Sequence, residues 1–292
     1  MGAVLNHAFC ATSGRTFDAG LRYPVTRAVG IDVGGTKIAA GLVDVENGRV
    51  LAREELPTRP ERGGREVLAD CAALAYALES GTLPVGIGLC ELVGLDGRPA
   101  SADTVDWRDL DLSSIVEAPR LVLVSDVMAA ARAEARFGAG ADRSPFLYVV
   151  VGTGASACLV VGGEPYVGSR GLALVLGAPP VETLASGSAL ARRAGVDRAE
   201  DVIADPAWAW LVDEAADALG QVLAVLVNAL DPELVVVGGG LGREPSFHAR
   251  VAAALHPLIA YPRTPPLEVV GSALGADTGI VGAALAVSGA DR

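Results

Sequence analysis

Residues 29–44 read VGIDVGGTKIAAGLVD, and residues 147–162, about 118 positions further on, read LYVVVGTGASACLVVG. Each stretch runs from an apolar segment through a Gly/Thr turn into a second apolar segment. Short apolar runs bounded by glycine are typical of buried β-strands. The two stretches therefore predict two β-hairpins, and their similarity indicates that the chain holds two copies of one domain.

The segments around these hairpins alternate between strand and helix patterns. Further strands are predicted at residues 50–56, 85–89, 121–124, 165–167 and 234–237. Apolar residues at helical spacing predict helices at residues 65–79, 129–137, 208–230, 247–258 and 279–287. This alternation favours an α/β protein.

The composition limits the kinds of ligand and partner. The chain has 292 residues, of which 51% are apolar and 20% are charged, so it can bury a sizeable core. Its net charge of −12 argues against a general basic surface for nucleic acid or for a membrane. An anionic ligand would have to be held by backbone N–H groups, a placed cation or a metal ion. The single lysine, Lys37, stands in the first hairpin turn.

The cysteines and the N-terminus indicate a compartment. The four cysteines are far apart without a CxxC pair, which argues against a structural zinc site and against a disulfide framework. The N-terminus lacks an apolar signal core, so we expect a cytoplasmic protein. Residues 146–163 carry no charge, but their glycines and valines favour a buried hairpin over a transmembrane helix.

The first hairpin turn has the composition of an anion-binding loop. Adjacent glycines let backbone N–H groups approach an anion, and the threonine and lysine add a hydroxyl and a charge. The aspartate before the turn is placed to bind the hydration shell of Mg²⁺. The residues that we predict to bind a nucleotide here are Asp32, Gly34, Gly35, Thr36 and Lys37. A plain hairpin turn with a surface lysine is the alternative for a single such motif.

The second turn, Gly152-Thr153-Gly154, weakens that alternative, because two such turns can hold a polyphosphate from opposite sides. Neither is a P-loop, since no GxxxxGK[ST] pattern occurs. Gly238-Gly239-Gly240 ends an apolar strand and would allow a flat ligand such as adenosine to approach closely. An ordinary strand-to-helix connection is the alternative there.

Two acids precede predicted helices. Asp126 follows a buried strand and could take a proton from a substrate hydroxyl, although by itself a helix-capping role explains it better. Glu182 precedes a helix that starts near Ser186, and by itself is better explained as a first-turn acid favoured by the helix dipole.

Taken together, these motifs resemble those of the ROK family of sugar kinases, over residues 28–286. The motifs that carry the resemblance are DVGGTKIAAGLVD (32–44), DTVDW (103–107), SDVMAAARAE (125–134), VGTGASACLVVGG (151–163), VETLASG (181–187) and DPELVVVGGGL (231–241). The resemblance implies two duplicated actin-like, ribonuclease-H-like α/β domains with an interdomain cleft.

The resemblance also implies an activity. It implies ATP- and Mg²⁺-dependent phosphorylation of a primary hydroxyl on a sugar-like polyol. Asp126 would be the general base, and Asp32 would hold Mg²⁺ through water. The residues that would contact the polyol are Glu91, Asp103, Ser125, Asp126 and Glu182.

The departures from the family pattern concern the acceptor. Val175 and Ala178 stand where the family has a sugar-contacting Glu and a zinc-binding His, and the cysteine-rich zinc loop is absent. The resemblance therefore implies no zinc and an altered site for the anomeric hydroxyl. We expect a poor glucokinase, and favour a modified hexose, an aminosugar or a C7-cyclitol as the acceptor.

Pattern and resemblance together divide the chain into an extension (1–27), an N-terminal α/β domain (28–134) to which a C-terminal helix (279–288) returns, and a C-terminal α/β domain (135–278). A homodimer is implied by the resemblance alone. Because ROK relatives include transcriptional repressors, a non-catalytic sugar or nucleotide sensor is the alternative function. We expect 27 residues to be too few for the DNA-binding domain that repressors carry. A decayed pseudokinase is a third interpretation.

Overall fold

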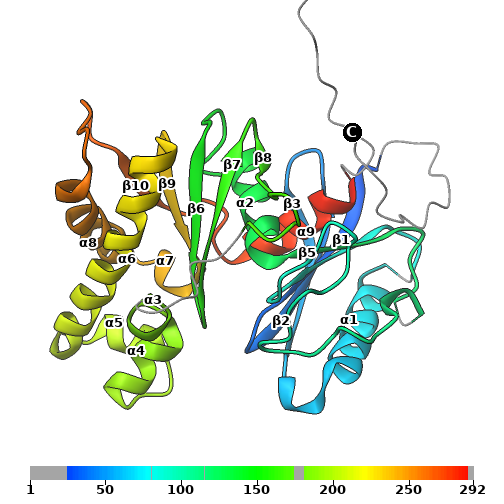
Figure 1. Cartoon of the computed structure of the whole chain (residues 1–292). Coiled ribbons are helices and arrows are strands. Elements are labelled where there is room, and N and C mark those ends of the chain that lie inside the picture. The colour runs from blue at the N-terminus through cyan, green and yellow to red at the C-terminus, as the bar shows by residue number, and fades with distance from the viewer. Residues whose placement is uncertain (1–24, 80, 115, 174–180, 289–292) are drawn as a thin grey trace, which may run out of the picture.

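The computed structural model describes residues 25–79, 81–114, 116–173 and 181–288, and it contains two five-stranded sheets (Figure 1). The first has the order β3-β2-β1-β4-β5 and is built from β1 (Arg27–Val33), β2 (Lys37–Asp44), β3 (Arg49–Pro57), β4 (Val85–Leu89) and β5 (Leu121–Ser125). The second has the order β10-β9-β6-β7-β8 and is built from β6 (Phe146–Val151), β7 (Ala155–Val161), β8 (Glu164–Pro165), β9 (Leu234–Gly238) and β10 (Glu268–Gly271).

The two sheets share one topology. In each, the first three strands form an antiparallel meander, and the last two run parallel to the first strand. The predicted hairpins are β1–β2 and β6–β7, so the duplicated α/β fold is confirmed. Most of the predicted extension, and both Val175 and Ala178, lie outside the described residues.

Helices cover the outer face of each sheet. The helix α1 (Gly64–Glu79) places Val67, Leu68 and Cys71 against the first sheet, at the spacing that its sequence predicts. The long helix α6 (Ala209–Leu230) packs its apolar face against the second sheet. The shorter helices are α3 (Val181–Leu184), α4 (Gly187–Ala194), α5 (Ala199–Ala204), α7 (Gly239–Gly242) and α8 (Pro245–Leu255). Single 3₁₀ turns occur at Pro60–Arg62, Leu112–Ser114, Pro206–Trp208, His256–Leu258 and Gly275–Asp277.

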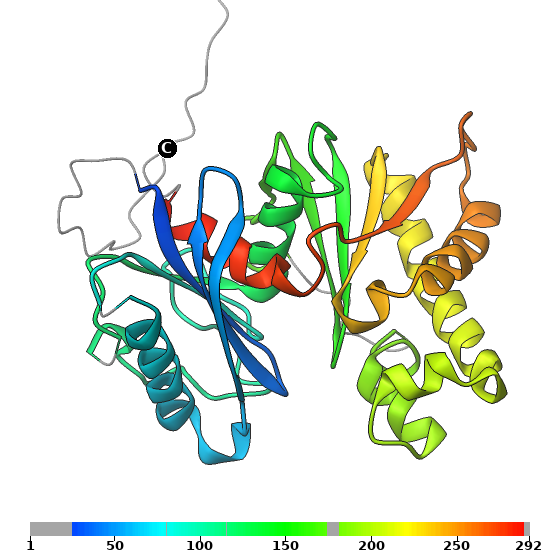
Figure 2. The same ribbon diagram turned by 180° about the vertical axis from the view of Figure 1, so that it is seen from behind.

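Two helices lie between the sheets, α2 (Asp126–Phe137) and α9 (Thr278–Ser288) (Figure 2). The helix α2 buries Met128 and Ala131 in one cluster with Phe146, Tyr148 and Val236 of the second sheet. The helix α9 packs on β1 and β4 of the first sheet and on α2. The layer order is therefore α1, first sheet, α9 with α2, second sheet, α6. The predicted domain boundary after residue 134 stays a prediction.

Glycines let α9 lie directly on its neighbours. A Cβ atom built on Gly30 would stand 1.9 Å from the carbonyl oxygen of Ile280, and one on Gly86 would stand 1.8 Å from that of Ala283. On the other side of the helix, a Cβ atom on Gly282 would stand 1.7 Å from the carbonyl oxygen of Ala129 in α2. Any side chain at these positions would force the helix away from the sheet or from α2.

The stretch with the length of a membrane span, residues 146–163, is the hairpin of β6 and β7. Within the described ranges, no helix is both long enough and apolar enough to cross a bilayer.

Candidate active site

The molecule has two lobes, one built around each sheet. The tips of the hairpins β1–β2 and β6–β7 meet between them. A Cβ atom built on Gly35 would lie 3.5 Å from the methyl carbon of Thr153, and equally 3.5 Å from that of Thr104. The first turn is closed by the Gly34 N–H, which donates to the Lys37 carbonyl at 2.9 Å. The second is closed in the same way by Gly152 N–H and the Gly154 carbonyl, also at 2.9 Å. The two turns thus form one surface from two lobes.

Both turns are held by hydrogen bonds from neighbouring segments. The Thr58 hydroxyl donates to the Gly34 carbonyl at 2.7 Å, and its backbone N–H donates to the Thr36 carbonyl at 3.0 Å. In the second lobe the Ser188 hydroxyl donates to the Thr153 carbonyl at 2.7 Å. These bonds fix the backbone of the turns before any ligand arrives, which lowers the entropic cost of binding.

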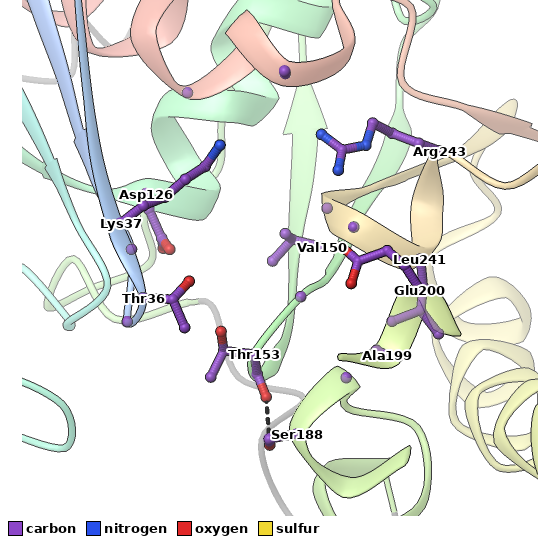
Figure 3. Close-up of a pocket in the computed structure, with 18 of the residues that line it drawn as sticks. Thr36, Lys37, Asp126, Val150, Thr153, Ser188, Ala199, Glu200, Leu241 and Arg243 are labelled. Carbon is purple, nitrogen blue, oxygen red and sulfur yellow. Dashed lines mark hydrogen bonds between the residues drawn. The ribbon is translucent and has the colours of Figure 1, made fainter. Parts of the chain in front are cut away.

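A cavity of about 660 Å³ opens between the turns, within the range of cofactor and substrate sites. Figure 3 shows Asp126, Lys37 and Thr36 on one side of it, and Glu200, Leu241 and Arg243 on the other. The sequence-predicted residues that line it are Asp32, Gly34, Gly35, Thr36, Lys37, Asp126, Gly152, Thr153, Gly239 and Gly240. Predicted residues from four separate segments therefore share one cavity.

The three glycines 238–240 have two different roles. The first makes room for a buried side chain, and the other two line the cavity. A Cβ atom on Gly238 would stand 2.1 Å from the hydroxyl of buried Tyr148, so this glycine makes room for the tyrosine. Gly239 has a φ of +83° and lies against the Val151 carbonyl, where a Cβ atom would be 2.4 Å away. Only glycine fits both demands. Gly239 and Gly240 face the cavity at the start of α7.

Asp126 is the first residue of α2, and Ser125 occupies the capping position. One carboxylate oxygen of Asp126 accepts the Val127 N–H at 2.7 Å. Burial, with the negative charge of Asp32 next in importance, raises the pKa of Asp126 to about 7. A carboxylate in this environment is an effective proton acceptor near neutral pH.

Asp32 faces the same cavity from the end of β1. Burial raises its pKa to about 6, against the lowering effect of Lys37 and Arg53. Its carboxylate lies under the start of α9, where a Cβ atom on Gly279 would be 2.3 Å from an oxygen of Asp32. Two carboxylates thus stand close together with both pKa values raised, an arrangement that a divalent cation would relieve.

This donor set fits Mg²⁺, which binds in proteins through one or two carboxylates, waters and substrate phosphates. Among the described residues, no group of three or more His, Cys, Asp or Glu side chains gathers into a complete metal cage. The expectation that the protein binds no zinc stays a prediction.

Lys37 stands at the mouth of the cavity with its side chain half exposed. Its ammonium lies 3.2 Å from a Glu55 carboxylate oxygen, and Arg53 binds the same oxygen at 2.7 Å. An exposed pair of this kind is weak, so the lysine can turn toward an anion in the cavity at little cost.

Glu91 is buried, and its carboxylate holds a loop. One oxygen accepts the N–H groups of Thr104 at 2.6 Å and Val105 at 2.9 Å, and the other accepts the Asp103 N–H at 2.9 Å and the Ser101 hydroxyl. All four partners lie in the loop that carries exposed Asp103 and reaches Gly35 through Thr104. Glu91 is not among the cavity-lining residues, so its direct contact with a polyol stays a prediction.

We expect Glu91→Gln to loosen this loop, because one oxygen becomes an NH₂ group that faces N–H donors. The free energy of unfolding should fall by about 1–3 kcal/mol, and the acceptor KM should rise roughly tenfold with a smaller change in kcat. Thermal unfolding and steady-state kinetics measure both. Ser101→Ala is the comparison variant, because it leaves the carboxylate intact and removes one of its donors together with the acceptor of the Leu92 N–H. An unchanged acceptor KM would show that the loop does not contribute to the acceptor site.

The other predicted acceptor residues lie near the cavity but do not line it. The Ser125 hydroxyl accepts the Val93 N–H at 3.0 Å. Glu182 accepts the Ala155 N–H at 3.1 Å and lies beside Gly154, so it supports the second hairpin. Their contacts with an acceptor remain predictions.

Several lining residues escaped the sequence analysis: Gly187, Ser188, Asp197, Arg198, Glu200, Arg243, Gly275, Ala276, Thr278 and Gly279. Arg243 follows the glycine run by three positions, and its charge there is the one local signal that could have found it. No sequence pattern indicates that the charged residues at 197–200 line a cavity, because short charged segments of this kind are common at the exposed starts of helices.

Comparison with known proteins agrees with this architecture. The family model described as "ROK family" matches residues 28–290. The chain belongs to the ROK family. Its matched residues include both hairpins, α2 and α9, which are the elements that form the cavity.

ROK proteins similar to this chain include sugar kinases. The bifunctional enzyme NanE/NanK of Brucella melitensis is 29% identical over 89% of this chain, which spans about half (54%) of that enzyme's length. The glucokinase of Streptomyces coelicolor is 30% identical, with 88% of this chain and 96% of that enzyme aligned. The crystal structure of a ROK glucokinase from Streptomyces griseus in complex with glucose and AMPPNP matches with a TM-score of 0.76 and 28% identity, covering 88% of this chain and 98% of that chain.

Proposed function

We propose that this protein is an ATP-dependent kinase that phosphorylates a primary hydroxyl of a sugar-like polyol. The observation that carries the proposal is the meeting of the two glycine turns over one cavity into which the Asp126 carboxylate projects. The glucokinase names of two relatives, and the AMPPNP in the Streptomyces griseus structure, support the same activity.

The residues divide the work of phosphoryl transfer between the lobes. The N–H groups of the turns at Gly34–Thr36 and Gly152–Gly154 hold the phosphates from two sides. Lys37 adds a positive charge, and Gly239 and Gly240 leave room for the nucleoside. Asp126 accepts the proton of the acceptor hydroxyl as its oxygen attacks the terminal phosphorus in line. Catalysis of this kind depends on positioning and charge compensation.

Asp32, through water, and the nucleotide phosphates would hold Mg²⁺. When bound, the ion offsets the negative charge that develops on the phosphates. The start of α9 packs directly on the Asp32 carboxylate, where Gly279 leaves no room for a side chain.

For the acceptor we propose a modified hexose, an aminosugar or a C7-cyclitol. Valine and alanine at positions 175 and 178 cannot hydrogen-bond an anomeric hydroxyl, so the site should discriminate weakly in favour of glucose. The name of another relative, the N-acetylmannosamine kinase of Yersinia pseudotuberculosis, which is 29% identical, is consistent with an aminosugar acceptor.

The test is ATP consumption with a panel of hexoses, N-acetylated and free aminosugars and cyclitols, in the presence of Mg²⁺. We expect turnover with at least one modified acceptor and a much lower kcat/KM for glucose. Robust glucose turnover at micromolar KM would contradict the acceptor proposal. Absence of turnover with every acceptor, together with tight sugar or nucleotide binding, would favour a sensor.

The pKa of Asp126 gives a pH dependence. Because the base must be ionised, we expect kcat/KM to rise about tenfold per pH unit below pH 7 and to level off above it. Initial rates in constant-ionic-strength buffers from pH 5 to 9 measure this, after each coupling enzyme has been shown not to limit the rate. A flat profile across that range would show that Asp126 is already ionised at pH 5, and would contradict its raised pKa in the reacting enzyme.

A further inference from the structure

The chain crosses between the two lobes twice, and both crossings meet at one buried carboxylate. The first crossing is residues 138–145, which lead from α2 to β6, and the second is residues 272–277, which lead from β10 to α9. Glu134, near the end of α2, is fully buried between them.

The side chain of Glu134 binds the second crossing. One oxygen accepts the Ser272 hydroxyl at 2.6 Å and the Leu274 N–H at 3.1 Å. The other oxygen accepts the Ala273 N–H at 3.1 Å. Ser272 in turn lies 2.9 Å from the Thr278 hydroxyl, so the bonds reach the first residue of α9.

The same residue binds the first crossing. The oxygen that accepts from Ala273 also accepts the Ala139 N–H at 2.8 Å. The backbone carbonyl of Glu134 accepts the N–H groups of Gly138 and Gly140, both at 3.1 Å. One residue therefore joins α2 to both interlobe segments.

Both ends of this arrangement touch the cavity. The second crossing continues into Gly275, Ala276, Thr278 and Gly279, all of which line it. Asp126, at the other end of α2, faces the same cavity two helical turns from Glu134. A helix of two turns keeps its shape, so a change in how Glu134 holds the crossings would shift Asp126 relative to the second lobe.

We propose that Glu134 is a positioning residue that fixes the hinge between the lobes and so places Asp126 opposite the glycine turn of the second lobe. The proposal rests on the proposed kinase function only for its effect on turnover, because the hinge itself is defined by contacts within the chain. The carboxylate accepts from five groups, the fifth being the Thr278 hydroxyl at 3.5 Å, so only a side chain with two acceptor oxygens satisfies them all.

The main variant is Glu134→Gln, which keeps the shape but turns an NH₂ group toward backbone donors. Glu134→Asp keeps both oxygens on a shorter stem. Ser272→Ala is a milder change that removes one bond to the carboxylate and the contact with the Thr278 hydroxyl. Glu233→Gln, at an exposed position, is the matched control. Circular dichroism and thermal unfolding identify the temperature range in which each variant is folded.

The first readout is amide hydrogen exchange of the free protein, which needs no acceptor. In Glu134→Gln we expect exchange at least tenfold faster at residues 139–140 and 273–274. We expect the same at the distant Leu95, whose N–H donates to the Arg170 carbonyl of the second lobe at 3.3 Å and therefore depends on the lobe arrangement. Ser272→Ala should show the same pattern at about threefold. Faster exchange confined to the two crossings would overturn the hinge proposal.

The second readout is kinetic. We expect kcat per folded molecule to fall at least tenfold and the Kd of AMPPNP with Mg²⁺ to rise several-fold in Glu134→Gln, with partial recovery in Glu134→Asp. A lower melting temperature with unchanged kcat and Kd would show that Glu134 serves stability alone. If the wild-type protein phosphorylates no acceptor, the kinase proposal fails, whereas the exchange pattern still decides the hinge.

Discussion

Replacing Asp126 by Asn should lower kcat by roughly 10²–10⁴-fold, the usual contribution of a general base. Asparagine has the same shape and can keep the bond to the Val127 N–H, but it cannot accept a proton. The nucleotide groups on the two turns are untouched, so the Kd of AMPPNP should change by less than about threefold. Turnover with the best acceptor of the panel, and calorimetric binding of AMPPNP, measure the two quantities.

The same substitution should make the protein more stable at neutral and higher pH. The folded-state pKa of Asp126 is raised from 3.8 to about 7, so the folded state binds its proton more tightly than the unfolded state. The free energy of unfolding therefore falls as pH rises from about 4 to 7, and the full penalty is present above pH 7. Asparagine removes this penalty, by roughly 2 kcal/mol once the partial exposure of the carboxylate is taken into account.

Thermal unfolding of both proteins at pH 4 and pH 8 tests this, with Asp217→Asn on the exposed face of α6 as the matched control. The gain in melting temperature should appear at pH 8 and vanish near pH 4. A variant that is inactive but no more stable at pH 8 would show that burial does not penalise the charge of Asp126. A variant with wild-type kcat would remove the general base from the proposed mechanism.

Adding one methyl group at Gly282 should destabilise the protein by about 3 kcal/mol or more. Helix propensity predicts the opposite, because alanine in a helix interior is favoured over glycine by about 1 kcal/mol. The added Cβ atom would lie 1.7 Å from the Ala129 carbonyl oxygen, so α9 and α2 must separate. At 2–4 °C per kcal/mol, the melting temperature should fall by roughly 6–12 °C.

Differential scanning calorimetry of Gly282→Ala measures this fall. Ser288→Ala, at the partly exposed end of the same helix, is the control and should change the melting temperature by no more than about 2 °C. Because α2 carries Asp126, the folded fraction of Gly282→Ala should also turn over more slowly than the wild type. A melting temperature equal to or above that of the wild type would contradict the close packing of these two helices.

Local sequence patterns were sufficient for the hairpins. In β1–β2 and β6–β7 the apolar run, the glycine turn and the second run are all adjacent in the chain, and an apolar run bounded by glycines has few other ways to bury itself. The duplicated sheets, and the meeting of the two turns, follow from that repeat. The place of Asp126 beside them was implied by the resemblance to the ROK family. The strand β10 has only four residues after a proline-rich stretch, and no pattern of that length predicts a strand.

The roles of single polar residues could not be predicted from the sequence. Nothing in the sequence around Glu91 or Glu134 indicates that each carboxylate is buried among backbone N–H groups, because their partners lie in loops whose course is set by tertiary packing. Likewise Glu200 and Arg243 reach the cavity only because α5 and α7 lie side by side. The roles of such residues can be identified only from the three-dimensional structure.

The position of α9 also has a consequence for folding during translation. This helix is the last described element, yet it fills the inner face of the sheet built from residues 27–125. At a synthesis rate of about 5–20 residues per second, the first sheet would wait on the order of ten seconds for the segment that closes it. During that time its glycine-lined face is exposed, and the N-terminal lobe cannot mature by itself while the ribosome is still translating the rest.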